Sequence, residues 1–378
     1  MNRTSELARQ AIVAFQQHIA ALGFCPAVHF ELEGCCQLEN GQRLSAKHFD
    51  FINRQFKQRK IAAKLVDEYW HNQWEYVSEF AGQTPLQEAE FLSLALKLLP
   101  NLFARQGVSK TLIKPVVWSG DDGQMAMGSR SIFTHHSRAV HIPNAIQVNV
   151  SVFRNGKNLI PQQAFGELLQ RCLMNTSLSC CLLYLPEEEA YERLALKTKY
   201  GLAQELCSPI DISGGHQGSI ALYKEQGKHN QPMGVKVLLE DINQQALLSE
   251  QNWQETARVE HRLGAASLAY DPFINVAFTL ANVIDALEIF CADKSEEILS
   301  VAERVETLPT NMYHDSMGES AYSLFARETW FSARIEKTIT WLNQYSSTSA
   351  PSDLGTQLKR SILTTYQPSS AAALVTAG

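Results

Sequence analysis

The segment Ala257–Leu287 joins a polar strand to a long apolar helix, and this junction constrains the fold more than any other stretch. It reads ARVEHRLGAASLAYDPFINVAFTLANVIDAL. Alternation along Arg258–Leu263 puts Glu260 and Arg262 on one face of a strand and His261 on the other. A carboxylate beside a guanidinium suits a metal and an anion bound side by side. The alternative is a surface ion pair, which contributes little to stability.

The second half of this segment predicts a helix. After Pro272 the chain is apolar from Phe273 to Leu287, and the polar interruptions are few. They are Asn275, Asn282 and Asp285.

Composition indicates an ordinary globular protein. The chain has 378 residues, is 45% hydrophobic and 19% charged, and carries a net charge of −6. It has no basic block, which argues against nucleic acid or an anionic membrane as a partner. No apolar run stands out as a membrane span, and the N-terminus lacks a signal-peptide layout. Eight cysteines without zinc-site spacing fit reduced thiols in a cytoplasmic protein.

A second strand carries two carboxylates. Helical spacing over Thr4–Leu22 is followed by Ala27–Glu33, AVHFELE, which alternates like a strand. Glu31 and Glu33 share one face of it. Two carboxylates this close repel each other unless they are solvated or share a cation. The alternatives are therefore a solvated edge strand and a cation site.

A third stretch contributes two more acids. Glu68 and Glu75 are seven residues apart, so one continuous strand would point them to opposite faces. They could meet only if a turn lies between them, and His71-Asn72 is a fair turn sequence. The alternative is chance, because acidic residues are common.

A fourth stretch, Ile146–Ile160, reads IQVNVSVFRNGKNLI and predicts a strand with Gln147, Asn149 and Ser151 on one face. Amide oxygens can bind Mg²⁺, but an amide cannot carry a proton. The preceding stretch, 119–143, contains His135, His136 and His141. Adjacent histidines on a strand point apart, so we interpret this stretch as a loop and not as a metal site.

These segments occur in an order that resembles the glutamine synthetase superfamily. The resemblance extends from Thr4 to Asn343. It is carried by Glu31-x-Glu33, by Glu68, Gln73 and Glu75, by Lys114-Pro115, by Ser151 with Gly156-x-Asn158-Leu159, by Tyr191, Arg193 and Leu194, and by Arg258-x-Glu260-x-Arg262. It implies an α+β catalytic domain over 1–345, with antiparallel strands lining a funnel and helices packed outside. The segment 346–378, rich in Ser, Thr and Ala, is expected to be a flexible tail.

The resemblance also implies roles for these residues. Glu33, Glu68 and Glu75 would hold one Mg²⁺ or Mn²⁺ ion, and Glu31, Gln147 and Glu260 a second one. Asn149 and Ser151 would face ATP, while Arg193 and Arg262 would hold a substrate carboxylate and phosphate. For Arg193 the alternative is a surface helix position balanced by Glu187–Glu189.

The chain departs from the family pattern at several positions. Gln147 and Asn149 replace two histidines, so the second metal site is expected to be the weaker one. Lys199-Tyr200-Gly201 lacks the flap acid, and Gly215 and Gln217 stand where the family has phosphate-binding arginines. Because the sequence begins close to the Glu31-x-Glu33 strand, we expect the small domain that precedes the catalytic domain in the family to be missing, and residues 223–253 look like an insertion without a recognisable motif.

Two functions remain open. The first is an ATP-dependent ligase that forms a γ-glutamyl amide through an acyl phosphate, from glutamate or a similar carboxylate and an amine other than ammonia. The second is a non-catalytic relative with a structural or regulatory role. Either could be a homo- or hetero-oligomer.

Overall fold

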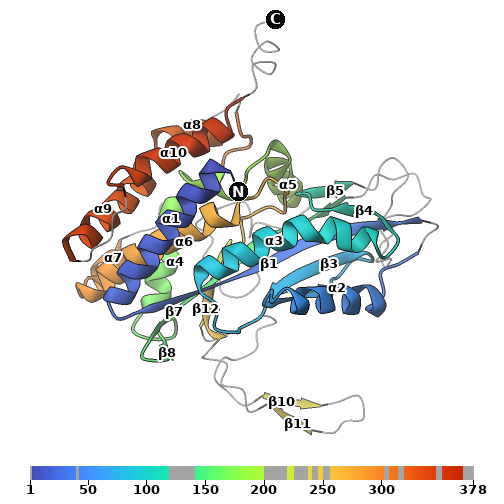
Figure 1. Ribbon diagram of the computed structural model, residues 1–378. Coiled ribbons are helices and arrows are strands. Elements are labelled where there is room, and N and C mark those ends of the chain that lie inside the picture. Colours follow the sequence, from blue (N-terminus) through green and yellow to red (C-terminus); the bar gives the residue numbers. More distant parts are fainter. Residues whose placement is uncertain are drawn as a thin grey trace, which may run out of the picture.

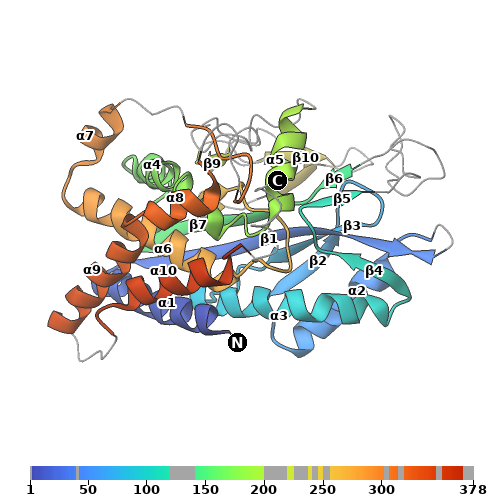
Figure 2. The same ribbon diagram turned by 90° about the horizontal axis from the view of Figure 1, so that it is seen from above.

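The computed structural model describes ten stretches of the chain. They are residues 2–39, 42–118, 141–199, 219–224, 237–240, 246–249, 256–301, 306–313, 319–345 and 351–368. Figures 1 and 2 show these stretches from two directions.

The largest sheet is built around one long strand, β1 (Cys25–Leu38). Its strands run antiparallel throughout, in the order β2-β3-β1-β7-β12-β9, with β4 also paired to β1 and β8 to β7. The other strands are β2 (Ala63–Asp67), β3 (Gln73–Ser78), β4 (Val108–Leu112), β7 (Ile146–Arg154), β8 (Lys157–Asn158), β9 (Ile220–Tyr223) and β12 (Arg258–His261). The predicted α+β class is confirmed.

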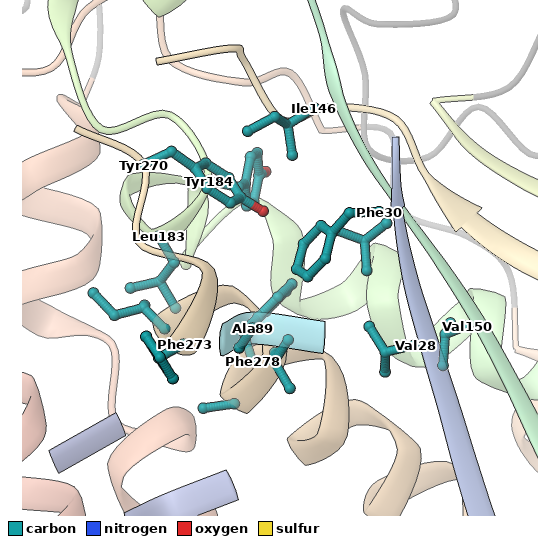
Figure 3. Close-up of a cluster of buried hydrophobic side chains, with 14 of the residues drawn as sticks. Val28, Phe30, Ala89, Ile146, Val150, Leu183, Tyr184, Tyr270, Phe273 and Phe278 are labelled. Atoms are coloured by element: carbon teal, nitrogen blue, oxygen red, sulfur yellow. The ribbon is translucent and has the colours of Figure 1, made fainter. Parts of the chain in front are cut away.

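Helices cover one face of this sheet. Val28, Phe30 and Leu32 alternate along β1 and are fully buried in the main hydrophobic core. Figure 3 shows Val28 and Phe30 in the same cluster as Phe278 of α6 (Pro272–Cys291) and Ala89 of α3 (Pro85–Ala104). In Figure 2, α3 and α1 (Arg3–Ala21) run along one side of β1. Because side chains alternate along a strand, the residues between the apolar ones point to the opposite face.

Helix α6 is the central core helix. Pro272 occupies its first turn, and the Asp271 side chain accepts hydrogen bonds from the N–H groups of Phe273 and Ile274. By length and hydropathy α6 could cross a membrane, although it includes the charged residues Asp285 and Glu288. However, 78% of its apolar window is buried inside the protein, where it packs against α1, α3 and α4 (Phe165–Ser177).

The C-terminal residues correct the prediction of a flexible tail. Leu354–Thr365 forms helix α10, which packs against α1 and α9 (Trp330–Tyr345). Its Leu358 and Ile362 are fully buried. Within this Ser- and Thr-rich stretch, apolar residues recur at every fourth position. That spacing places them on one face of a helix, which packs against the core.

Two shorter segments are irregular. The stretch Lys110–Trp118 is divided between β4 and β5 (Val116–Trp118), which pair with different neighbours. Pro115 lies at the break and has no N–H to donate to a ladder. The stretch Leu178–Leu185 contains a short 3₁₀ helix at Cys181–Leu183.

The remaining elements complete the described chain. They are α2 (Ala46–Gln58), β6 (His141–Pro143), α5 (Glu188–Lys199), β10 (Val237–Glu240), β11 (Ala246–Ser249), α7 (Ser295–Ser300) and α8 (Ala321–Arg327). The β10–β11 pair gives an antiparallel hairpin within the segment that was expected to be an insertion.

Gly34 is required by the packing of Trp74. The two residues are directly opposite on β1 and β3, and a Cβ built on Gly34 would lie 2.3 Å from a ring carbon of Trp74. Trp74 is fully buried and contacts Phe103 of α3, so its ring has little room to move.

We predict that Gly34→Ala lowers the free energy of unfolding by about 1–3 kcal/mol. Denaturant titration should show a much smaller loss for Gly34→Ala in a Trp74→Leu background; equal losses would contradict the steric cause.

His261 should make the protein sensitive to acid. It is enclosed by the rings of Tyr184 and Phe278, and its Nε2 lies 3.1 Å from Ser177 Oγ. Burial lowers the pKa of His261 to about 3. Between about pH 6.5 and that value the unfolded chain binds the proton more strongly, so the free energy of unfolding falls as pH falls, by up to about 1.4 kcal/mol per pH unit.

The variant His261→Leu isolates this contribution. Asp271 and Asp285 have pKa values raised by burial and act in the opposite direction, so the wild-type pH dependence alone is a mixture. Chemical unfolding from pH 4 to 7 should give a weaker acid dependence for the variant than for the wild type. An unchanged slope would show that His261 does not titrate on unfolding.

Candidate active site

The face of the sheet opposite the helices carries the polar side chains that the sequence singled out. Register places Glu31 opposite Gln147, Glu33 opposite Glu75, and Glu260 opposite Asn149. Partners in antiparallel strands project from the same face, so β3, β1, β7 and β12 contribute to one continuous polar surface. It is called the polar face below.

Glu33 and Glu75 form a like-charged pair on the polar face. Side chains that are directly opposite on antiparallel strands have Cβ atoms about 4.5–5.5 Å apart, and two anions there destabilise each other. Glu33 Oε2 accepts a 2.8 Å hydrogen bond from the N–H of Ala145. Two carboxylates placed directly opposite each other on neighbouring strands suit a shared cation.

Glu68 joins this pair through a tight turn. Its N–H bonds the carbonyl of Gln73, which puts Glu68 opposite Gln73 and therefore on the same face as Glu75. The turn passes through Asn72, whose φ of 66° lies in the left-handed region that asparagine tolerates. A turn at His71-Asn72 was predicted, and the structure confirms it.

Glu31, Gln147 and Glu260 converge at a second position. Because both neighbours of the Gln147 amide are acceptors, its nitrogen is the atom that faces them. That nitrogen lies 2.5 Å from Glu260 Oε1 and 3.3 Å from Glu31 Oε2. Glu260 is fully buried, and Gln147 is nearly so. The amide therefore bridges the two carboxylates.

Two arginines and a tyrosine surround Glu260. Arg258 lies 3.4 Å from Glu260 Oε2, and Arg262 Nε lies 3.8 Å from Glu260 Oε1. The guanidinium of Arg258 stacks 4.4 Å from the centre of the Tyr223 ring, and Arg262 donates to the Tyr223 hydroxyl at 3.4 Å. Tyr223 thereby holds both cations beside one carboxylate.

Asn149 and Ser151, expected to face ATP, form hydrogen bonds with other residues of the protein. Asn149 donates to Glu31 Oε1 at 3.0 Å and accepts from Arg258 Nε at 2.6 Å. Ser151 donates to the carbonyl of Ala257 at 2.8 Å, and Asn158 donates to the same carbonyl at 2.7 Å. These contacts fix the start of β12 against β7.

Arg193 lies on α5, outside the sheet. Its side chain is fully buried, which excludes the alternative of a surface helix position. The neighbouring acid Glu189 pairs with Lys114 at 3.5 Å. A role for Arg193 in holding a substrate carboxylate stays a prediction.

The two metal positions implied by the resemblance differ in fit. Among the residues that the structure describes, no three His, Cys, Asp or Glu side chains are gathered closely enough to hold a metal ion. Glu33, Glu68 and Glu75 share one face of the sheet, and a hard cation held there would require their three carboxylates to approach one another more closely than they do in this structure. At Glu31, Gln147 and Glu260 the amide with its nitrogen turned toward both carboxylates satisfies them from within the chain, and in that orientation the position does not take a metal.

Several predicted features lie outside the described residues. His135 and His136 belong to this group, as do Gly201, Gly215 and Gln217. His141 begins β6, but its side chain is not described.

Sequence reasoning missed three participants in the polar face. Arg258 could have been found, because it is two residues before Glu260 and shares its strand face. Tyr223 comes from β9, and nothing in its local sequence indicates that contact. His29 lies two residues before Glu31 and bonds the buried Glu88 of α3 through Nδ1 at 2.9 Å, a partnership that requires the folded chain.

Comparison with known proteins gives a fold. No family model and no curated protein matches the sequence. Among solved structures, a glutamine synthase homolog is 13% identical with a TM-score of 0.61, over 96% of this chain and 72% of that one. An ADP complex of GmaS is 13% identical with a TM-score of 0.58, over 98% and 76%. Plasmodium falciparum glutamine synthetase is 10% identical with a TM-score of 0.58, over 95% and 75%. The chain therefore has the fold of the glutamine synthetase superfamily.

Proposed function

We propose that this protein is an ATP-dependent carboxylate–amine ligase that forms a γ-glutamyl amide through an acyl phosphate. The observation that supports it most is the polar face, where Glu33 lies opposite Glu75 and Glu68 shares their side of the sheet. The fold adds support, because one of the solved structures that share it contains ADP.

The reaction has two steps. A side-chain carboxylate oxygen of the substrate attacks the γ-phosphorus of ATP, which forms an acyl phosphate and releases ADP. The nitrogen of the amine then attacks the acyl carbon, the C–O bond to phosphate breaks, and the nitrogen loses a proton. Inorganic phosphate and the amide leave.

The acidic cluster of Glu33, Glu68 and Glu75 is assigned to the phosphorylation step. A divalent cation held there would neutralise charge on the transferred phosphoryl group. The three carboxylates of this chain would supply its oxygen ligands. Arg262, whose Nε lies 3.8 Å from Glu260 Oε1, would supply a fixed positive charge for an anionic substrate group.

The amine is proposed to be larger than ammonia. Ammonium must be bound as a cation and deprotonated before it attacks, which calls for an acid near the acyl carbon. The sequence has no acid at Lys199-Tyr200-Gly201, where the family pattern places one. An amine that reaches the site already neutral does not need that group.

A specific observation favours a second candidate, a non-catalytic relative with a structural or regulatory role. Glu31 and Glu260 are already paired with Gln147, Asn149 and Arg258. A surface whose charges are balanced internally is less suited to binding a triphosphate with its cations.

The acidic cluster yields a first test. We predict that Mn²⁺ binds to the protein and that Glu75→Ala weakens this binding at least tenfold, because one of three carboxylate ligands is lost. Isothermal calorimetry measures both. Glu79→Ala is the matched control, since Glu79 is exposed on the same segment. No binding heat at millimolar Mn²⁺, or equal weakening by both variants, would contradict the assignment.

The substrate class yields a second test. Phosphate release from ATP in the presence of glutamate should be small with ammonia and larger with one or more members of a panel of primary amines. Glu75→Gln should abolish it, whereas Glu79→Gln should not. Efficient glutamine formation from ammonia would contradict the amine proposal. No phosphate release with any amine, with Mn²⁺ still bound, would support the non-catalytic candidate.

A further inference from the structure

Each carboxylate oxygen of Glu31 and Glu260 has a hydrogen-bond or ion-pair partner within the protein. Glu31 Oε1 accepts from Asn149 at 3.0 Å, and Glu31 Oε2 accepts from the Gln147 amide at 3.3 Å. Glu260 Oε1 accepts from the same amide at 2.5 Å, and Glu260 Oε2 pairs with Arg258 at 3.4 Å. All four oxygens therefore face donors of this chain.

Charge around the pair is also balanced. Glu260 lies beside two guanidinium groups, Arg258 and Arg262, and Glu31 is linked to it through the amides of Gln147 and Asn149, so the cluster holds two carboxylates and two guanidinium groups. The amides of Gln147 and Asn149 are neutral. A divalent cation would add two positive charges to a buried group whose formal charges already cancel, and such an excess of buried charge is costly.

Contacts with Tyr223 and Asn149 fix the side chains of Arg258 and Arg262. The Tyr223 ring lies under the Arg258 guanidinium, and the Tyr223 hydroxyl accepts from Arg262. Asn149 accepts a 2.6 Å hydrogen bond from Arg258 Nε, which fixes that side chain a second time. Displacing Arg258 to admit a cation would break the stacking contact, the hydrogen bond and the ion pair together.

We propose that the chain's own side chains replace the second metal ion in this fold, with the Gln147 amide bridging Glu31 and Glu260 and Arg258 supplying the positive charge. The polar face then has one position for a divalent cation, at Glu33, Glu68 and Glu75, and one internal ion-pair network. This inference concerns the same surface as the proposed function but does not depend on catalytic turnover.

The test starts from Glu75→Gln, which removes a ligand from the acidic cluster so that the Gln147 position can be observed alone. Adding Gln147→Glu replaces the bridging N–H groups with a third carboxylate of nearly the same shape. We expect Glu75→Gln protein to show no Mn²⁺-dependent shift in unfolding temperature. With Gln147→Glu added, the unfolding temperature should fall in EDTA, because three carboxylates then repel, and should recover in Mn²⁺ with uptake of about one equivalent.

The matched control is Gln58→Glu, which makes the same chemical change at an exposed helix position. It should leave both the unfolding temperature and Mn²⁺ uptake unchanged. Should the double variant fail to fold, Glu260→Gln in the otherwise wild-type chain gives an independent measurement, and it should leave the Mn²⁺ stoichiometry unaltered.

The inference is overturned if the wild-type protein takes up two equivalents of Mn²⁺ and Glu260→Gln reduces this to one. It is also overturned if Glu75→Gln protein binds Mn²⁺ and loses that binding with Gln147→Leu. Neither result requires the protein to release phosphate. Failure of the proposed ligase activity would therefore be distinguished from failure of this inference.

Discussion

The strict alternation of side chains along β1 is the constraint on which the rest of the structure depends. Its apolar residues pack under α3 and α6, and its polar ones point to the opposite face. Three strands, β3, β4 and β7, hydrogen-bond directly to β1. A shift of register by one residue would exchange the two faces and bury Glu31 and Glu33 under helices, so the hydrophobic core and the polar face specify each other.

Acidic groups on the polar face are compensated in two different ways. Glu33 and Glu75 oppose each other with like charge, and one backbone N–H contributes to their balance. Glu31, on the same strand as Glu33, and Glu260, two strands further on, are surrounded by amide and guanidinium donors. One position therefore sets like charges directly opposite each other, which suits a cation, and the other sets each carboxylate beside donors of the chain. This asymmetry is the physical basis for choosing between a ligase and a non-catalytic relative.

Much of the fold followed from local sequence. Helical spacing predicted α1 and α6, alternation predicted β1 and β7, and the turn at Asn72 was recognisable as such. Helix α10 was missed because its composition is polar and its apolar residues are few; packing against α1 and α9 supplies the stability that local sequence lacks. The split between β4 and β5 was missed because each half pairs with a different strand, a choice that depends on distant parts of the chain.

The sequence by itself determined which residues share a strand face, because the period of a strand is fixed by backbone geometry. It thus placed Glu31 with Glu33, Gln147 with Asn149, and Glu260 with Arg262. Which of these groups satisfy one another was decided by tertiary structure alone. The bridge from Gln147 to Glu31 and Glu260 needs the register of three strands, and the clamp of Tyr223 on two arginines needs a fourth. Hydrogen bonds and ion pairs depend on distances of a few ångströms between residues that are far apart in the chain, and only folding sets those distances.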